Sequence, residues 1–184
     1  MTTKRNFIKQ FFKNKNMVGA ITPSSKFLGK KMLSKIDFNS AKIIIELGPG
    51  TGVFTDLIIQ RMSPDAKLFV FELNDNFYTS LAARITDPRV HVIHDSASNI
   101  SKQLKTGEQA DLIVSSLPLT VFSEKLRKSV ITESHQILKE AGTYVQFQYS
   151  LQAKRLLEAT YKTVSVSFTL KNIPPAFIYK CIKT

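Results

Sequence analysis

The chain has 184 residues, 43% of them hydrophobic, which suits one α/β domain with a sizeable core. Its single cysteine, Cys181, excludes an internal disulfide and a thiolate zinc site, and its three histidines are scattered without metal-ligand spacing. No apolar run is long enough to span a membrane and no secretory leader is evident, so we expect a monomeric protein of the reducing cytoplasm without a metal ion.

The net charge of +12 is concentrated at the N-terminus. Residues 1–36 hold nine Lys or Arg and no acid, whereas the remaining residues hold 17 basic side chains against 14 acidic ones. A polyanion is the natural partner of such a segment, either nucleic acid or an anionic lipid surface. We therefore treat residues 1–36 as a basic N-terminal extension and residues 37–184 as the main body of the domain.

Residues 4–17 favour an amphipathic helix whose apolar side chains share an arc about 140° wide. The arc holds Phe7, Ile8, Phe11 and Phe12, and Lys9 and Lys13 lie opposite. This pattern is typical of a helix that lies in a lipid interface, and it fits a terminal helix docked on its own domain equally well. A second helix is expected to begin at Ser24 or Ser25 and to run to about Ile36.

An apolar β-branched run ends in an acid and three alternating glycines at residues 43–52. It predicts a buried strand that leads into a nucleotide-binding turn, because glycines let the backbone turn sharply and approach a ligand. A helix expected from Val53 would direct its first N–H groups at that ligand. The spacing is G-x-G-x-G, unlike the G-x-G-x-x-G of nicotinamide and flavin folds. The candidate binding residues of this turn are Glu46, Gly48, Pro49, Gly50, Thr51 and Gly52.

Two further predicted strands are followed by acids. The strand at residues 67–71 ends at Glu72, where a carboxylate is placed to accept hydrogen bonds from both hydroxyls of a ribose. The strand at residues 90–93 is followed by Asp95, which could meet an adenine or simply cap a helix. Their neighbours Leu73, Ser96 and Ala97 complete this candidate set.

The remaining chain continues the alternation of strands and helices, which argues for a parallel, doubly wound sheet. We expect a short helix at 99–104, a strand at 111–116, a helix from the Ser123 cap to about Lys139 ended by Gly142, a strand at 143–149 and a helix at 151–161. Two last strands, at 164–170 and 176–182, have no helix between them and so form an antiparallel pair. Cys181 falls in the last strand, as a core residue.

Together these residues resemble the class I S-adenosylmethionine-dependent methyltransferases. The stretch from Glu46 to Gly52 looks like their first motif and Glu72 like their second. The resemblance implies S-adenosylmethionine as the cofactor, with Ser115 added to its binding residues. It also implies a Rossmann-like, seven-stranded mixed sheet in the order 3-2-1-4-5-7-6 with helices on both faces.

Three stretches, 18–25, 116–119 and 172–176, look more narrowly like the bacterial phospholipid N-methyltransferases. This resemblance implies methylation of phosphatidylethanolamine towards phosphatidylcholine, by an enzyme peripheral on the inner face of the cytoplasmic membrane. Tyr149 would orient the amine, unless it is only a pocket wall, with Ser115 and Ser116 offering hydrogen bonds. That family commonly has Ser-Gly-Leu-Pro where this chain has Ser-Ser-Leu-Pro, and the side chain of Ser116 could narrow the acceptor pocket.

Two alternatives stay open. The chain also resembles ribosomal RNA adenine dimethylases, but adenine N6 methylases usually have Asn-Leu-Pro-Tyr or Asp-Pro-Pro-Tyr at the fourth motif, where Ser116 and Leu119 stand here. This difference and the expected lack of a separate RNA-binding domain disfavour nucleic acid as the substrate. The second alternative is a membrane-docking module that binds the cofactor without catalysis.

Overall fold

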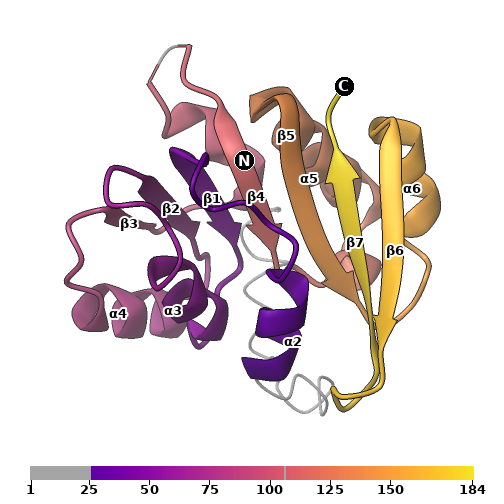
Figure 1. Cartoon of the computed structure of the whole chain (residues 1–184), viewed down its shortest axis with the longest axis horizontal. Coiled ribbons are helices and arrows are strands. Elements are labelled where there is room, and N and C mark those ends of the chain that lie inside the picture. Colours follow the sequence, from indigo (N-terminus) through magenta and orange to yellow (C-terminus); the bar gives the residue numbers. More distant parts are fainter. Residues whose placement is uncertain (1–25, 106) are drawn as a thin grey trace.

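The computed structural model describes residues 26–105 and 107–184. The amphipathic helix predicted over residues 4–17, with Phe7, Ile8, Phe11 and Phe12, lies outside the described residues. The described chain forms one seven-stranded sheet in the order β3-β2-β1-β4-β5-β7-β6, as predicted (Figure 1). The strands are β1 (Ile43–Leu47), β2 (Lys67–Phe71), β3 (Val90–Ile93), β4 (Ala110–Ser115), β5 (Leu138–Gln148), β6 (Thr163–Thr169) and β7 (Ala176–Ile182).

The first five strands are parallel, and β7 pairs antiparallel with both β5 and β6. β1 lies between β2 and β4, with Leu47 opposite both Phe71 and Ser115. From β1 the chain builds the sheet outward through β2 and β3, and from β4 it builds the sheet in the opposite direction. The connections that follow β1 and β4 therefore diverge, and ligands of open α/β sheets bind at such a point.

Helices cover both faces of the sheet (Figure 1). The helical elements are α2 (Lys26–Met32), α3 (Val53–Ile59), α4 (Asp75–Arg84), η1 (Ala97–Lys102), η2 (Leu119–Val121), α5 (Glu124–Ile137) and α6 (Lys154–Thr160). One apolar core contains Ile44, Val114 and Phe147 and packs under α2 and α3. The other contains Leu47, Ile113 and Tyr144 and packs under α5 and α6. Alternate residues of each central strand therefore face different helix layers.

Residues 26–36 belong to the folded unit and are not separate from it. Leu28, Met32 and Leu33 are buried in the core that α2 shares with α3. Gly29 allows the close approach of the two helices, since a Cβ there would collide with Leu57 of α3. The described part of the expected N-terminal extension therefore packs against the rest of the domain.

The predicted end of the long helix was wrong. α5 ends at Ile137 and β5 begins at Leu138, so Gly142 lies inside a strand and does not cap a helix. The extra length of β5 comes with a shift in its register against β4 and with a left-handed residue, Ala141, at φ 61°. The N–H of Ala141 donates to the carbonyl of Lys183 at 2.9 Å, so pairing with a distant segment extends the strand.

Candidate active site

The glycine turn follows β1 and has left-handed backbone at each of its three glycines. Gly52 has φ 84°, and a Cβ on it would lie 2.6 Å from a methyl group of Leu81, so this glycine is required by packing within the protein. Gly50 has φ 56°, and a Cβ on it would meet nothing within 4 Å. Only Gly50 therefore borders open space, which is the position that a ligand's close approach requires.

Glu72 is tied to this turn by its carboxylate. One oxygen accepts from the backbone N–H of Gly50 at 3.1 Å and the other from that of Asn74 at 2.7 Å. A carboxylate has about four acceptor positions, so each oxygen keeps one for a further donor such as a ribose hydroxyl. Burial raises the pKa of Glu72, and backbone hydrogen bonds from Asn74, Gly50 and Leu73 oppose that rise.

Glu46 is fully buried at the end of β1, and neither carboxylate oxygen has a hydrogen-bond partner among the described residues. Burial raises its pKa to about 8, and the charges of Asp56 and Glu72 add to the rise, while the nearby Thr55 hydroxyl opposes it. An unpaired buried carboxylate is costly, so it is expected to hold a proton or to face a bound cation. This residue is the clearest sign within the turn of a positively charged ligand.

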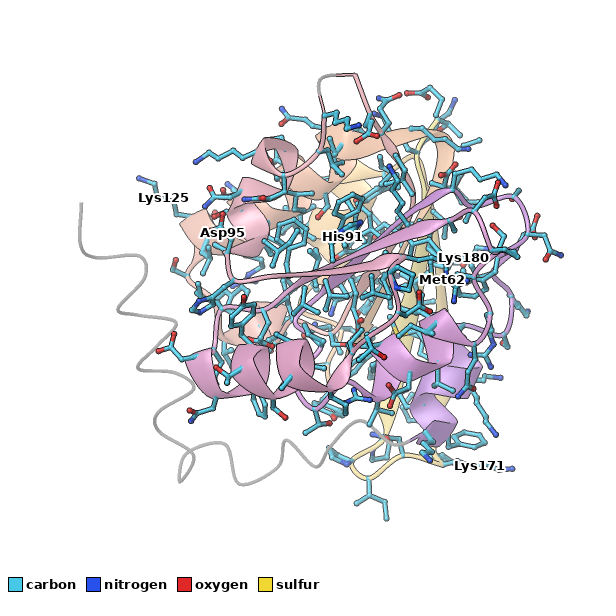
Figure 2. The ribbon with its side chains drawn as sticks, turned by 90° about the vertical axis from the view of Figure 1, so that its left-hand side faces the viewer. Met62, His91, Asp95, Lys125, Lys171 and Lys180 are labelled. Atoms are coloured by element: carbon cyan, nitrogen blue, oxygen red, sulfur yellow. The ribbon has the colours of Figure 1, made fainter. Side chains whose placement is uncertain are left out.

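A cleft opens at the carboxyl ends of β2, β3 and β4. It is lined by Gly48, Phe71, Glu72, Leu73, Asp95, Ser96, Ala97, Leu117, Phe122, Leu126 and Val130. The cleft thus brings together several predicted binding residues: Gly48, Glu72, Leu73, Asp95, Ser96 and Ala97. Asp95 also anchors η1, because its Oδ1 accepts from Ser96 and Asn99, while its Oδ2 receives only a 3.4 Å contact from Gln103. Figure 2 shows Asp95 at this side of the molecule.

Ser115 is the last residue of β4, and Ser116 is the first residue of the loop that follows it. Ser115 is fully buried on the α5 face, where its hydroxyl accepts from the N–H of Leu117 at 3.4 Å. The side-chain amides of Gln146 and Gln148 both donate to the Leu117 carbonyl, at 3.0 and 2.9 Å. Ser115 therefore supports the loop after β4 from within the core. The hydroxyl of Ser116 is buried and has no partner among the described residues, so it can serve a ligand.

Tyr149 follows β5 on the α2 face, next to the Phe147 ring at a centroid distance of 5.6 Å. It is 37% exposed. Burial raises the pKa of its hydroxyl, and a hydrogen bond with the Asn172 side chain partly offsets the rise. Tyr149 consequently keeps its proton at neutral pH and presents a fixed, half-exposed hydroxyl at the same edge as the glycine turn.

Several site residues were missed from the sequence. Phe122, Leu126 and Val130 line the cleft at helical spacing, a signal visible in the sequence that predicts one helix face. Asn172 is buried, donates to the carbonyl of Pro174 at 2.7 Å and contacts Tyr149. No local pattern relates Asn172 to Tyr149, because Tyr149 follows β5 and Asn172 lies in the connection between β6 and β7.

Neither a metal site nor a membrane span is evident within residues 26–105 and 107–184. No group of three or more His, Cys, Asp or Glu side chains there could hold a metal ion. No helix in the same part of the chain is long and apolar enough to cross a membrane.

Comparison with known proteins identifies the family. A family model described as ribosomal RNA adenine dimethylase matches residues 2–170. The chain belongs to this family. It is accordingly an S-adenosylmethionine-dependent methyltransferase, and the fold and cofactor predictions are confirmed.

Individual relatives of this methyltransferase differ in their named substrates. An ornithine lipid N-methyltransferase of Singulisphaera acidiphila is 29% identical over 179 residues, covering 95% of this chain and 93% of that protein. A ribosomal RNA small subunit methyltransferase A of Metamycoplasma arthritidis is 29% identical over 140 residues, covering 74% of this chain and 51% of that protein. The chain thus spans about half the length of that ribosomal RNA methyltransferase.

Solved structures share the fold of this methyltransferase. A precorrin-6y C5,15-methyltransferase from Geobacter metallireducens has a TM-score of 0.71 at 17% identity, covering 85% of this chain and 89% of that one. The N-methyltransferase NodS from Bradyrhizobium japonicum, in complex with S-adenosyl-L-homocysteine, has a TM-score of 0.66 at 12% identity, covering 86% and 85%.

The residues of the turn and cleft fit S-adenosylmethionine, which supplies an electrophilic methyl group when bound. Glu72 has acceptor positions for the ribose hydroxyls, and Asp95 keeps Oδ2 for an amino group. The unpaired carboxylate of Glu46 matches the positive charge of the cofactor. Gly50 leaves the space that a close backbone approach needs.

Proposed function

We propose that this methyltransferase methylates the amine of a lipid headgroup at an anionic membrane surface. Phosphatidylethanolamine, methylated towards phosphatidylcholine, is the proposed acceptor, and an ornithine lipid is the second candidate because a relative matched along 93% of its length bears that name. Both lipids offer a primary amine, which is the shared chemistry. The enzyme would act as a monomer, peripheral on the cytoplasmic face of the membrane, through the helix predicted at residues 4–17.

The observation that carries this proposal is the side chain at position 119. Adenine N6 methylases usually have an aromatic ring at this position, which stacks on the flipped base. This chain has Leu119, which is fully buried in the core beneath α5. At the first position of the same motif, Ser116 replaces the amide or acid that accepts the adenine amino proton. The loop after β4 therefore lacks both groups that would hold a flipped adenine in that way.

The chemistry requires the amine to be neutral before it is methylated. A primary amine resembles lysine, with a pKa of about 10, so the site has to favour loss of one proton to water. Burial near Phe147 and Tyr149 disfavours the charged ammonium form, because a low-dielectric environment penalises charge. The hydroxyls of Ser116 and Tyr149 can then position the neutral nitrogen, and positioning at about 3 Å from the methyl is worth several kcal/mol.

Methylation of ribosomal RNA is the second candidate. It is favoured by the family model over residues 2–170 and by relatives named as ribosomal RNA small subunit methyltransferases. The net charge of +12 suits RNA as well as an anionic bilayer, so charge alone does not separate the two substrates.

One assay separates the candidates. The purified full chain is given labelled S-adenosylmethionine with vesicles of phosphatidylethanolamine and phosphatidylglycerol, with vesicles containing ornithine lipid, or with unmodified ribosomal RNA. We expect label in lipid, with Glu72→Ala as a control that transfers less label at a limiting cofactor concentration. Label in RNA alone would replace the lipid function, and no transfer to any acceptor would favour a non-catalytic module.

A further inference from the structure

The tip of the β6–β7 hairpin, residues 170–175, exposes its largest apolar side chains to solvent. Leu170 is 72% exposed and Ile173 is 83% exposed, the two highest values among the large hydrophobic residues of the described chain. Between them Asn172 is buried, and it donates to the carbonyl of Pro174 at 2.7 Å. The Asn172 amide therefore points into the protein and hydrogen-bonds within the tip, while the side chains of Leu170 and Ile173 face the solvent.

The tip is attached to its neighbours and not isolated. The ammonium of Lys171 lies 5.3 Å from the ring centroid of Phe27 in the first turn of α2, and Phe27 is itself 39% exposed. Asn172 contacts the hydroxyl of Tyr149. Figure 1 shows the hairpin tip beside the N-terminal end of α2, beyond the ends of β4 and β5, and Figure 2 shows Lys171 at this same end.

Lysines border this apolar surface, and Asp56, which lines a hollow together with Lys26 and Lys30, is ion-paired with Arg84. Residues 26–36 and 159–184 contain eight lysines and no acid. Three of these lysines lie on α2 or on the tip itself: Lys26 begins α2, Lys30 is in its last turn and Lys171 is on the tip. Protruding aliphatic side chains bordered by cations complement an anionic bilayer, which accepts the apolar groups below its headgroups and attracts the lysines.

We propose that the hairpin tip, together with Phe27, is a lipid-contacting wedge that enters an anionic bilayer. The inference rests on the proposed function and deepens it, because Asn172 connects the wedge to Tyr149 at the candidate amine site. Seating the tip in the headgroup layer brings the carboxyl edge of the sheet to the membrane, where a headgroup amine can reach Tyr149 without the lipid leaving the bilayer. The wedge is distinct from the helix predicted at residues 4–17.

Tryptophan fluorescence tests the contact directly, because the chain contains no tryptophan. Ile173→Trp in the full chain gives a single reporter at the tip, and Gln109→Trp gives a matched control at an exposed position directly before β4, at the opposite end of the sheet. With vesicles of phosphatidylethanolamine and phosphatidylglycerol, we expect a blue shift at position 173 and quenching by brominated acyl chains. The control reporter should show neither.

Placing acidic side chains on the apolar surface measures its contribution to vesicle binding. The double variant Leu170→Asp with Ile173→Asp should partition onto these vesicles at least tenfold more weakly than the wild type. Val166→Asp is the matched control, because Val166 is exposed on the same hairpin but lies in the middle of β6. Methyl transfer to a water-soluble, short-chain phosphatidylethanolamine should be equal in all three proteins if the proposed function holds.

The outcomes are separable. Vesicle binding without quenching at position 173, or unchanged binding of the double aspartate variant, overturns the wedge whatever the enzyme methylates. A blue shift that depends on protein concentration without lipid, together with a dimer in light scattering, assigns the tip to a second copy of the chain. A fluorescence change at position 173 on addition of RNA, without one on addition of vesicles, overturns the lipid contact as well. Absence of methyl transfer to any lipid refutes the proposed function. The quenching result at position 173 then decides separately whether the wedge enters the bilayer.

Discussion

At the scale of single residues, two buried carboxylates have different tasks at the same turn. Glu72 accepts two backbone hydrogen bonds and so holds the turn in shape while keeping acceptor positions for a ligand. Glu46 has no partner among the described residues and is therefore the side chain most sensitive to the presence of a cation or a proton. The two acids can be distinguished by experiment.

Replacing Glu72 tests the ribose contact. We expect Glu72→Ala to weaken S-adenosylmethionine binding by about 1–3 kcal/mol, because hydrogen bonds to a charged group are lost and the N–H of Gly50 loses its acceptor. Titration calorimetry measures the change, with circular dichroism to check folding and Glu158→Ala as a half-exposed control. Unchanged affinity in a folded Glu72→Ala protein would remove Glu72 from the cofactor site.

Replacing Glu46 tests the buried charge. Burial raises its pKa from 4.5 to about 8, so the folded protein keeps a proton that the unfolded chain loses. The stabilisation from this proton is complete below about pH 4.5, declines as the pH rises and is gone above about pH 8, a difference of about 5 kcal/mol at 1.36 kcal/mol per pKa unit.

We therefore expect Glu46→Gln to flatten the fall in the free energy of unfolding between about pH 5 and pH 8. A smaller slope of the same sign should remain, because burial also raises the pKa of Glu72. Urea unfolding of the cofactor-free protein at several pH values measures both slopes. Equal slopes in the wild type and the variant would show that Glu46 does not titrate in this range.

At the scale of elements, the segment before α2 and the β6–β7 hairpin are the two candidate membrane contacts. The predicted helix at residues 4–17 is about 14 residues long, and helices of that length are marginal alone in water. Its formation is therefore expected to depend on a surface that accepts Phe7, Ile8, Phe11 and Phe12. The hairpin tip, by contrast, is held in place by the buried Asn172.

Removing the predicted helix should separate membrane binding from cofactor binding. We expect deletion of residues 1–16 to weaken binding to anionic vesicles at least tenfold and to leave S-adenosylmethionine affinity nearly unchanged, because the glycine turn lies outside the deletion. Phe11→Glu should have most of the same effect by placing a charge in the apolar arc. Vesicle flotation of the deletion variant at the wild-type level, at low salt, would show that this segment has only a structural role.

At the scale of the whole molecule, the candidate contacts lie at one end of the sheet. The tip, the first turn of α2 and the ends of β4 and β5 are neighbours in Figure 1. The net charge of +12 on the whole chain also predicts salt-dependent binding, since a Debye length of about 10 Å at 0.1 M salt falls to about 3 Å at 1 M. Raising the salt concentration should therefore weaken the electrostatic part of membrane binding and leave the apolar part.

The salt dependence is measured by vesicle cosedimentation. We expect binding of the full chain to phosphatidylglycerol-containing vesicles to fall at least tenfold between about 0.05 M and about 0.5 M salt, because exposed charges are screened while apolar burial is not. Binding that does not change with salt would show that apolar burial alone holds the protein on the membrane. Uncharged vesicles provide the matched control, with weak binding at both salt concentrations.

Local sequence patterns predicted the strands and the edge of the sheet at which we expect the ligand, and the family resemblance supplied the strand order. Strands such as Ile43–Leu47 are encoded by local apolar runs, and the acids Glu72 and Asp95 follow their strands directly, so the cleft could be predicted without distant contacts. Contacts between distant parts of the chain were needed to show which side chains face that site. Ser115 and Ser116 are adjacent in sequence, and the packing around β4 buries the first in the core and leaves the hydroxyl of the second without a partner among the described residues. Likewise, the partner of Tyr149 is Asn172, and the strand at Gly142 is extended by pairing with Lys183. In the hairpin tip Ile173 is exposed while its neighbour Asn172 is buried. These features are set by hydrogen bonds and packing between residues far apart in the chain, which no local pattern encodes.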